Sequence, residues 1–245
     1  MIKHTTRFSV KVISFSLYGD NPIYTTGAIK NAELKETYFR DWKMWVYHNN
    51  SVPSIVLDEL AALNVRLINT REENSGFLGS LWRFRPLADQ QVERFISRDC
   101  DSRISIRDEI AVNEWINSEK KFHIIRDHPK GHRYLINAGM WGAKGNSIPN
   151  FSELMSTYIQ KNTRKRDCTV DQRFLADVIY KLIVSDLFVH DEFFNYEGIS
   201  IKIKRSRCLD EFAFIGEIID EHGRFRCSDR RVITTHFKNN SSDYV

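Results

Sequence analysis

The chain has 245 residues, 42% of them hydrophobic and 12% aromatic, which is enough to bury a full core. Its net charge of +4 comes from 36 basic and 32 acidic residues, and this small, dispersed surplus argues against nucleic acid as a partner. Four widely spaced cysteines without a Cys-x-x-Cys pair argue against a zinc knuckle and a disulfide framework, and favour a reducing compartment. No apolar stretch approaches membrane-spanning length, so we expect a cytoplasmic protein.

The first seventy residues alternate between strand and helix patterns. Apolar and polar side chains alternate over 8–15 as in a strand, and residues 26–39 have helical spacing. A second strand over 42–47, a helix over 53–63 and a short strand over 65–68 follow. This order predicts an α/β fold with a mostly parallel sheet and crossover helices.

The middle of the chain continues with weaker patterns. A buried strand ends at Ser97, a helix is expected over 105–118, and another strand over 122–125. Apolar residues at helical spacing over 151–159 and 174–182 predict two helices with core-facing stripes. No repeat or low-complexity linker divides the chain.

The C-terminal part contains no recognisable motif. We expect one domain over 1–235 and a flexible tail over 236–245. The basic residues of the C-terminal part would suit an anionic membrane face or a lipid-linked acceptor, although a solvated surface is their more common role. They are Lys202, Lys204, Arg205, Arg207, Arg224, Arg226, Arg230 and Arg231.

Two aspartates, Asp99 and Asp101, stand one residue apart directly after the strand that ends at Ser97. Such carboxylates repel each other unless a cation lies between them, and their hard oxygen atoms suit Mg²⁺ or Mn²⁺. Ligands of open α/β sheets bind at the carboxyl ends of strands, where the ion would also take phosphate oxygens of a substrate. A solvated turn with incidental charges is the alternative, because a lone Asp-x-Asp is common.

Further motifs follow in a fixed order: Asn137-Ala138-Gly139-Met140-Trp141-Gly142, then Asp171-Gln172, then Val189-His190-Asp191. Together with Asp-x-Asp, this order resembles the nucleotide-sugar glycosyltransferases of the GT-A fold, including the glycogenin type. The pieces RDCDSR, DHPKGH and GMWG resemble bacterial and large-virus surface-glycan glycosyltransferases, including the chlorella-virus capsid type. The resemblance covers about 8–191 and implies a single-domain, Rossmann-like mixed sheet flanked by helices.

The resemblance also implies an activity and a set of site residues. The enzyme would move a sugar from a UDP-, GDP- or dTDP-sugar to a glycan or lipid-linked acceptor in surface-glycan synthesis, assisted by Mn²⁺ or Mg²⁺. Asp99, Asp101 and His190 would bind the metal, and Asp171 and Gln172 would lie beside the reacting sugar as catalytic residues. The remaining candidates for binding the nucleotide sugar, besides Asp99, are Phe15, Ser16, Leu17, Tyr18, Arg83, Arg98, Asp127, His128, Asn137, Ala138, Gly139 and Trp141.

Several of these residues also have a structural explanation. Thr169 and Gln172 have the spacing of a capping box, so Asp171 could merely favour the N-terminal end of the helix dipole. Trp141 would suit a core, and His190 could be a satisfied histidine at a strand end. Arg98 could form a structural ion pair, and Phe15 could be a core residue. Asp127 and His128 could likewise have only structural roles.

Two other functions fit the same residues. A metal-dependent phosphoesterase or nuclease would use Asp99, Asp101, His128 and His190 with a water nucleophile. A glycan-binding module would bind saccharide without metal. Within the transferase interpretation, retention and inversion both stay open, since Asp171 could serve an inverting enzyme as its base.

Overall fold

A computed structural model describes residues 9–71, 76–162, 167–205 and 212–239. Its centre is a seven-stranded sheet with the order β3-β2-β1-β4-β6-β5-β7. The strands are β1 (Val10–Leu17), β2 (Trp42–His48), β3 (Arg66–Asn69), β4 (Val92–Ser97), β5 (Phe122–Arg126), β6 (Trp141–Lys144) and β7 (Leu187–Asp191). Only β6 runs antiparallel to its neighbours β4 and β5, so the expected α/β fold with a mixed, mostly parallel sheet is confirmed.

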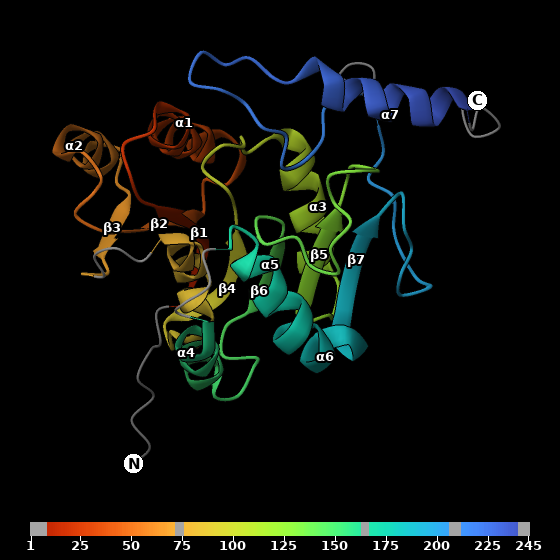
Figure 1. The fold of residues 1–245 in the computed structure, drawn as a ribbon. Helices are drawn as coiled ribbons and strands as arrows, with labels where there is room; N and C mark the ends of the chain where they lie inside the picture. Colours follow the sequence, from red (N-terminus) through yellow and green to blue (C-terminus); the bar gives the residue numbers. More distant parts are fainter. Residues whose placement is uncertain (1–8, 72–75, 163–166, 206–211, 240–245) are drawn as a thin grey trace.

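Helices cover both faces of the sheet (Figure 1). The α-helices are α1 (Pro22–Tyr38), α2 (Ser54–Ala62), α3 (Ile106–Asn117), α4 (Phe151–Asn162), α5 (Val170–Phe174), α6 (Tyr180–Ile183) and α7 (Cys227–Asn239). One core layer packs α1, α2 and α3 against the sheet. The other packs α4, α5 and the 3₁₀-helical segment η1 (Gly76–Ala88) against the opposite face. None of the helices in the described ranges is long and apolar enough to cross a bilayer.

The first half of the chain follows the predicted order of elements. The main difference is that α1 begins at Pro22, four residues earlier than expected. Asn21 caps this helix, because its side-chain oxygen accepts a hydrogen bond of 3.1 Å from the Ile23 N–H. Pro22 occupies the first helical turn, where its missing N–H costs nothing.

The predicted helix over 174–182 is not one regular helix. It consists of the end of α5, the π-helical turn η2 (Leu175–Ile179) and α6. Most of its apolar stripe still faces the core, where Phe174 and Ile179 are fully buried, but Leu182 at its end is 54% exposed. The spacing therefore predicted the buried face as far as Ile179, and predicted neither the exposure of Leu182 nor the backbone geometry.

The C-terminal part contains an element that the sequence pattern did not predict. Helix α7 runs to Asn239, so the first four residues of the expected tail are helical, while 240–245 lie outside the described residues. Figure 1 shows α7 lying across the end of the sheet to which β5 and β7 point. The Ile219 N–H donates a 2.8 Å hydrogen bond to the Asp101 carbonyl, which attaches this part of the chain to the loop after β4.

Candidate functional site

A cleft of about 730 Å³ opens at the carboxyl ends of β1 and β4. The chain leaves β1 towards β2 and β3 on one side, and β4 begins the other half of the sheet. This is the point where the strand order reverses, which is the usual ligand site of open α/β sheets. Tyr18 enters the cleft from the loop after β1, and Asp99 and Asp101 enter it from the loop after β4.

A buried arginine joins two of the cleft's carboxylates. Arg83, from η1, donates through Nη1 to Asp99 and through Nη2 to Asp171, the latter at 2.7 Å. Burial alone would lower the pKa of Arg83, but the two carboxylates outweigh burial and raise it. Arg83 therefore stays charged and holds the loop after β4 against the start of α5.

Two carboxylates of the cleft, those of Asp101 and Asp171, have raised pKa values. Burial, and then the charge of Asp99, raise the pKa of Asp101 to about 6. Burial also raises the pKa of Asp171, against the opposing effect of Arg83. Burial is the main cause of both shifts, so a cation bound beside these carboxylates would favour their ionised forms.

The same carboxylates fit a divalent ion of the hard, oxygen-binding type. Asp99 and Asp101 come from one loop and line one cleft, and the Asp99 side chain is 39% exposed. Within the described ranges no group of three or more His, Cys, Asp or Glu side chains could form a complete protein cage. The donor set therefore suits an ion that shares its coordination with waters and phosphate oxygens of a ligand.

The Asn137-Ala138-Gly139 segment forms the wall behind Asp99. Ser97 Oγ donates to the Ala138 carbonyl at 2.7 Å, and the Ala138 N–H donates to Gln172 Oε1 at 3.0 Å. A Cβ atom at Gly139 would lie 1.8 Å from Asp99 Oδ2, so only glycine fits there without displacing the carboxylate.

Gln172 therefore positions this wall. The capping-box alternative for Gln172 is wrong, because the Thr169 side chain makes no capping hydrogen bond and Gln172 reaches across to Ala138. Asn137 also lines the cleft, and its side-chain amide donates to the Ile125 carbonyl at 3.2 Å.

The loop after β1 brings only part of its predicted set to the cleft. Ser16 and Tyr18 line it, and burial raises the pKa of Tyr18 to about 12. The Tyr18 ring packs edge-on against Trp82 at 5.8 Å between centroids. Phe15 and Leu17 point to the opposite face of the sheet and belong to the core with α1, as alternation along a strand requires.

The structure does not bring His190 to the aspartates. Its Nδ1 lies 2.8 Å from His123 Nε2, and its Nε2 lies 2.7 Å from Glu114 Oε2, so both ring nitrogens have partners within the protein. The expectation of a metal ligand is corrected by the topology: β7 is the edge strand, three places away from β4.

Arg98 and Trp141 also lie outside the cleft lining. Arg98 is buried and donates through Nε to Asp108 at 2.9 Å, which is the structural ion pair that the sequence left open. Trp141 is fully buried between Phe84 and Phe95, with ring centroids at 5.4 and 5.0 Å. It belongs to β6, a core strand, and does not form a sugar platform.

Asp127 is likewise enclosed by protein groups. It accepts hydrogen bonds from Arg107, from Arg205 and, at 2.9 Å, from the Ile215 N–H. Burial would raise the pKa of Asp127, but the two guanidinium groups hold it below its ordinary value. Asp127 thus anchors the C-terminal part of the chain instead of contacting the cleft.

His128 does line the cleft, but both of its ring nitrogens are engaged. Nδ1 accepts the N–H groups of Lys130 and Gly131, at 3.2 and 2.8 Å, so Nε2 carries the proton and donates to the Asp229 carbonyl at 3.0 Å. Burial lowers the pKa of His128, which favours this neutral form. The histidine joins the loop after β5 to α7.

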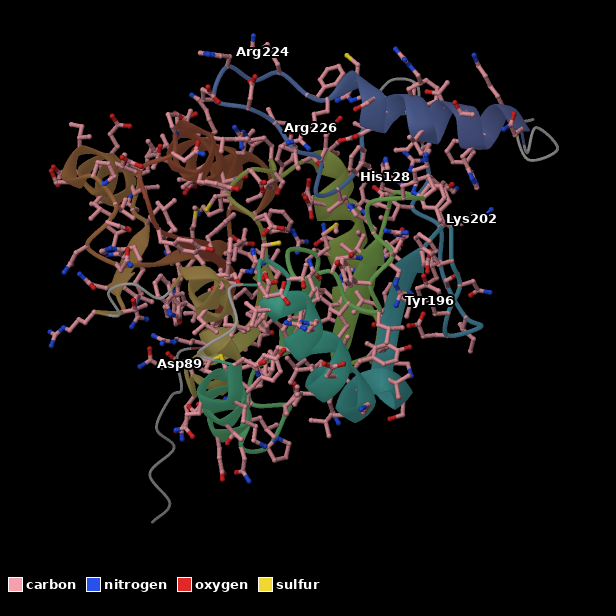
Figure 2. All side chains as sticks on the ribbon, viewed as in Figure 1. Asp89, His128, Tyr196, Lys202, Arg224 and Arg226 are labelled. Carbon is pink, nitrogen blue, oxygen red and sulfur yellow. The ribbon has the colours of Figure 1, made fainter. Side chains whose placement is uncertain are left out.

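Sequence reasoning missed the C-terminal wall of the cleft. Phe214, Gly216, Ile218, Arg226 and Val232 line it, facing Tyr24 and Asp101. Figure 2 shows His128 and Arg226 near α7, whereas Asp89 lies at the opposite end of the molecule. The apolar run EFAFIGEIID was the available signal, but nothing in it indicates which surface it covers.

No family model matches the sequence, and no curated protein matches it. Solved structures similar to this chain include a glycosyltransferase involved in the glycosylation of the major capsid of PBCV-1, at 15% identity over 75% of this chain and 81% of that chain, with a TM-score of 0.45. The 4-diphosphocytidyl-2C-methyl-D-erythritol synthase of Anaerococcus prevotii is 13% identical over 79% and 90%, with a TM-score of 0.46.

A third similar structure is the glucosyl-3-phosphoglycerate synthase of Mycobacterium tuberculosis in complex with Mn²⁺, UDP and phosphoglyceric acid. It is 13% identical over 74% of this chain and 67% of that chain, with a TM-score of 0.45. The matches thus include glycosyltransferases, the class that the motif order resembles. Likeness of this degree does not assign an activity, so the function rests on the residues of the cleft.

Proposed function

We propose that the protein is a metal-dependent glycosyltransferase that moves a sugar from a UDP-, GDP- or dTDP-sugar to a glycan acceptor. One observation carries the proposal: Asp99 and Asp101 share a single cleft with Tyr18 and Asp171 at the point where the strand order reverses. The motif resemblance adds the surface-glycan pathway to this proposal, and a cytoplasmic location with contact to the inner membrane face stays a prediction.

In this proposal the residues divide into three tasks. Asp99 and Asp101 hold Mn²⁺ or Mg²⁺, which when bound would neutralise the departing nucleoside diphosphate. Tyr18 offers its half-buried ring to the nucleobase. Asp171 lies on the far side of Arg83 and accepts a hydrogen bond from a sugar or acceptor hydroxyl, while Gln172 holds the Ala138 wall in place.

The phosphoesterase or nuclease alternative is disfavoured by the positions of its histidines. His190 lies away from the aspartates, and the ring nitrogens of His128 are committed to backbone groups. Neither histidine is placed to activate a water next to Asp99 or Asp101. Hydrolysis of a bis-phosphate ester without any sugar nucleotide would nevertheless favour this alternative.

The decisive experiment is a thermal-shift panel with UDP, GDP, dTDP and their sugars, with and without Mn²⁺. A nucleotide at about 100 times its Kd stabilises by about 2.7 kcal/mol, which raises Tm by roughly 5–10 °C for a chain of this length. The shift should require Mn²⁺ and disappear in Asp101→Ala. Asp58→Ala, on the exposed surface of α2, is the matched control and should keep it.

Failure of this experiment would be clear. If no nucleotide raises Tm in any condition, or if Asp101→Ala keeps the full Mn²⁺-dependent shift, the donor site is not where we propose. If a sugar nucleotide does stabilise the protein, release of its nucleoside diphosphate separates transfer or hydrolysis from mere binding.

A further inference from the structure

A second hollow, of about 430 Å³, lies between α7 and the loop after β5; we call it the α7 groove. One face of the helix lines it through Ser228, Arg231, Val232, Thr235, His236 and Asn239, which recur at helical spacing. Pro129 and Lys130 line the other side. Because Lys130 and Val232 also line the main cleft, the two hollows are adjoining parts of one surface depression.

The α7 groove is lined by cations, whereas the cleft contains charges of both signs. Lys130 and Arg231 contribute cations to its lining, which includes no Asp or Glu side chain. Both side chains are exposed, and among the described residues no ion pair involves either of them. The cleft next to it contains Asp99, Asp101 and Asp171 together with the cations of Arg83, Arg226 and the shared Lys130. The groove therefore favours an anionic part of a ligand whose other part lies in the cleft.

The remaining lining suits a saccharide. Asn239 offers an amide group, and the hydroxyls of Ser228 and Thr235, which donate within α7 to the Asp229 carboxylate and the Arg231 carbonyl, can still accept a hydrogen bond from a sugar hydroxyl. Val232 and Pro129 supply the apolar surface against which a sugar ring packs. The volume is within the range of roughly 300–1,000 Å³ that small-molecule sites occupy.

We propose that the α7 groove binds a phosphate-bearing saccharide unit of the acceptor, next to the unit that is glycosylated in the cleft. The Lys130 ammonium and the Arg231 guanidinium bind the phosphate, since both groups are suited to phosphate oxygens. This inference rests on the proposed glycosyltransferase function and adds to it the chemical class of the acceptor.

The test uses the full chain with saturating Mg²⁺ and the nucleoside diphosphate that stabilises it most. Glucose 6-phosphate and glucose are titrated separately, and binding is followed by amide chemical shifts in NMR spectra. Glucose 6-phosphate should bind about fivefold or more tightly than glucose, with shifts at Thr235 and its helix neighbours. The preference should weaken as salt is raised, because the cations are exposed.

Two variants locate the effect. Lys130→Gln combined with Arg231→Gln should reduce the affinity for glucose 6-phosphate about three- to tenfold and leave glucose unchanged, as expected for two exposed ion pairs. Lys238→Gln, an exposed lysine of α7 outside the groove lining, makes the same change of charge on the same helix and should have no effect.

Four results would overturn the inference: equal binding of the two sugars, a preference that survives in the double variant, a preference that Lys238→Gln also removes, and inorganic phosphate binding as tightly as glucose 6-phosphate. Binding to anionic phospholipid vesicles that the double variant abolishes, without a sugar preference, would instead assign the groove to a membrane surface. The nucleotide-dependent Tm shift of the same wild-type sample reports separately on the donor site, so the two proposals can fail independently.

Discussion

Gly139→Ala tests the geometry of the aspartate loop directly. The added Cβ would lie 1.8 Å from Asp99 Oδ2 and 2.5 Å from Asp99 Cγ, where ordinary contact begins at 3.4 Å. The carboxylate must therefore retreat by about 1.6 Å, because the wall that carries Gly139 is held by Ser97 and Gln172 and cannot yield easily. This movement would also disturb the pairing of Asp99 with Arg83.

The expected size of the effect follows from this displacement. Overpacking of a rigid site costs about 1–3 kcal/mol of unfolding free energy. A misplacement of roughly 1 Å at a reacting centre can lower activity about 10²-fold. We therefore expect a folded variant with a modest loss of stability and a severe loss of Mn²⁺-dependent nucleotide binding and sugar transfer.

The assay combines urea unfolding with calorimetric titration of nucleoside diphosphate in the presence of Mn²⁺. Asp99→Ala provides the matched background, because it removes the two atoms with which the new methyl group collides. In that background Gly139→Ala should cost less than about 0.5 kcal/mol of unfolding free energy, and the coupling between the two sites is the difference between the two costs.

Two outcomes would refute the reasoning. An equal cost in both backgrounds would show that the methyl group meets something other than Asp99. Wild-type nucleotide affinity in the Gly139→Ala variant would show that the position of Asp99 does not matter for the donor.

Three more variants test buried charges, two in the cleft and one where the C-terminal part of the chain is attached. The pKa of Asp101 is about 6 in the folded protein against 3.8 in the unfolded chain, so ionisation of Asp101 costs stability as pH rises between these values. In urea unfolding, Asp101→Asn should be more stable than wild type by about 1–3 kcal/mol at pH 8 and equally stable near pH 4. Equal unfolding curves at pH 8 would contradict this. Arg83→Met leaves the buried Asp171 unpaired and should lower the free energy of unfolding by about 3 kcal/mol at pH 8. Adding Asp171→Asn should recover most of this stability. No recovery in the double variant would disprove the pairing. The lowered pKa of Asp127 contributes stability above about pH 4, and this stability is lost as pH falls through the folded pKa. Asp127→Asn should therefore lower the free energy of unfolding by about 3–5 kcal/mol at pH 7 and by little at low pH. A loss that does not depend on pH would point to packing instead.

Much of the first half of the fold could be predicted from local patterns. The strand and helix periods of 8–68 reflect which side chains each element buries, and this depends on a few neighbouring residues. The position of Asp99 and Asp101 is local in the same sense, because they directly follow a strand whose end the sequence marks. The start of the helix expected over 105–118 is local too, because Ser105 caps α3 and its Oγ accepts from the Asp108 N–H at 3.3 Å.

The antiparallel strand β6 shows where such reasoning stops. Residues 141–144 include Gly142 and follow a glycine-containing motif, which is typical of a ligand loop. In the structure Trp141 pairs with Ser97 of β4 and Ile124 of β5, and these partners keep its indole in the core. The sequence allowed both a core position and a sugar platform for Trp141, and local sequence gives no sign of these partners, so it could not decide between the two.

The sequence by itself determined the elements that depend on neighbouring residues: the alternation of strands and helices in the first half of the chain, and the pair of aspartates at a strand end. Only the tertiary structure decided that Arg83 lies between Asp99 and Asp171, that Gly139 packs on Asp99, and that His190 lies elsewhere. Arg83 and Asp171 are 88 residues apart, and their contact depends on strand order and on which faces pack together. Hydrophobic periodicity specifies that a face is buried but not what is buried against it, which is why the charge balance of the site and its C-terminal wall emerged only from the fold.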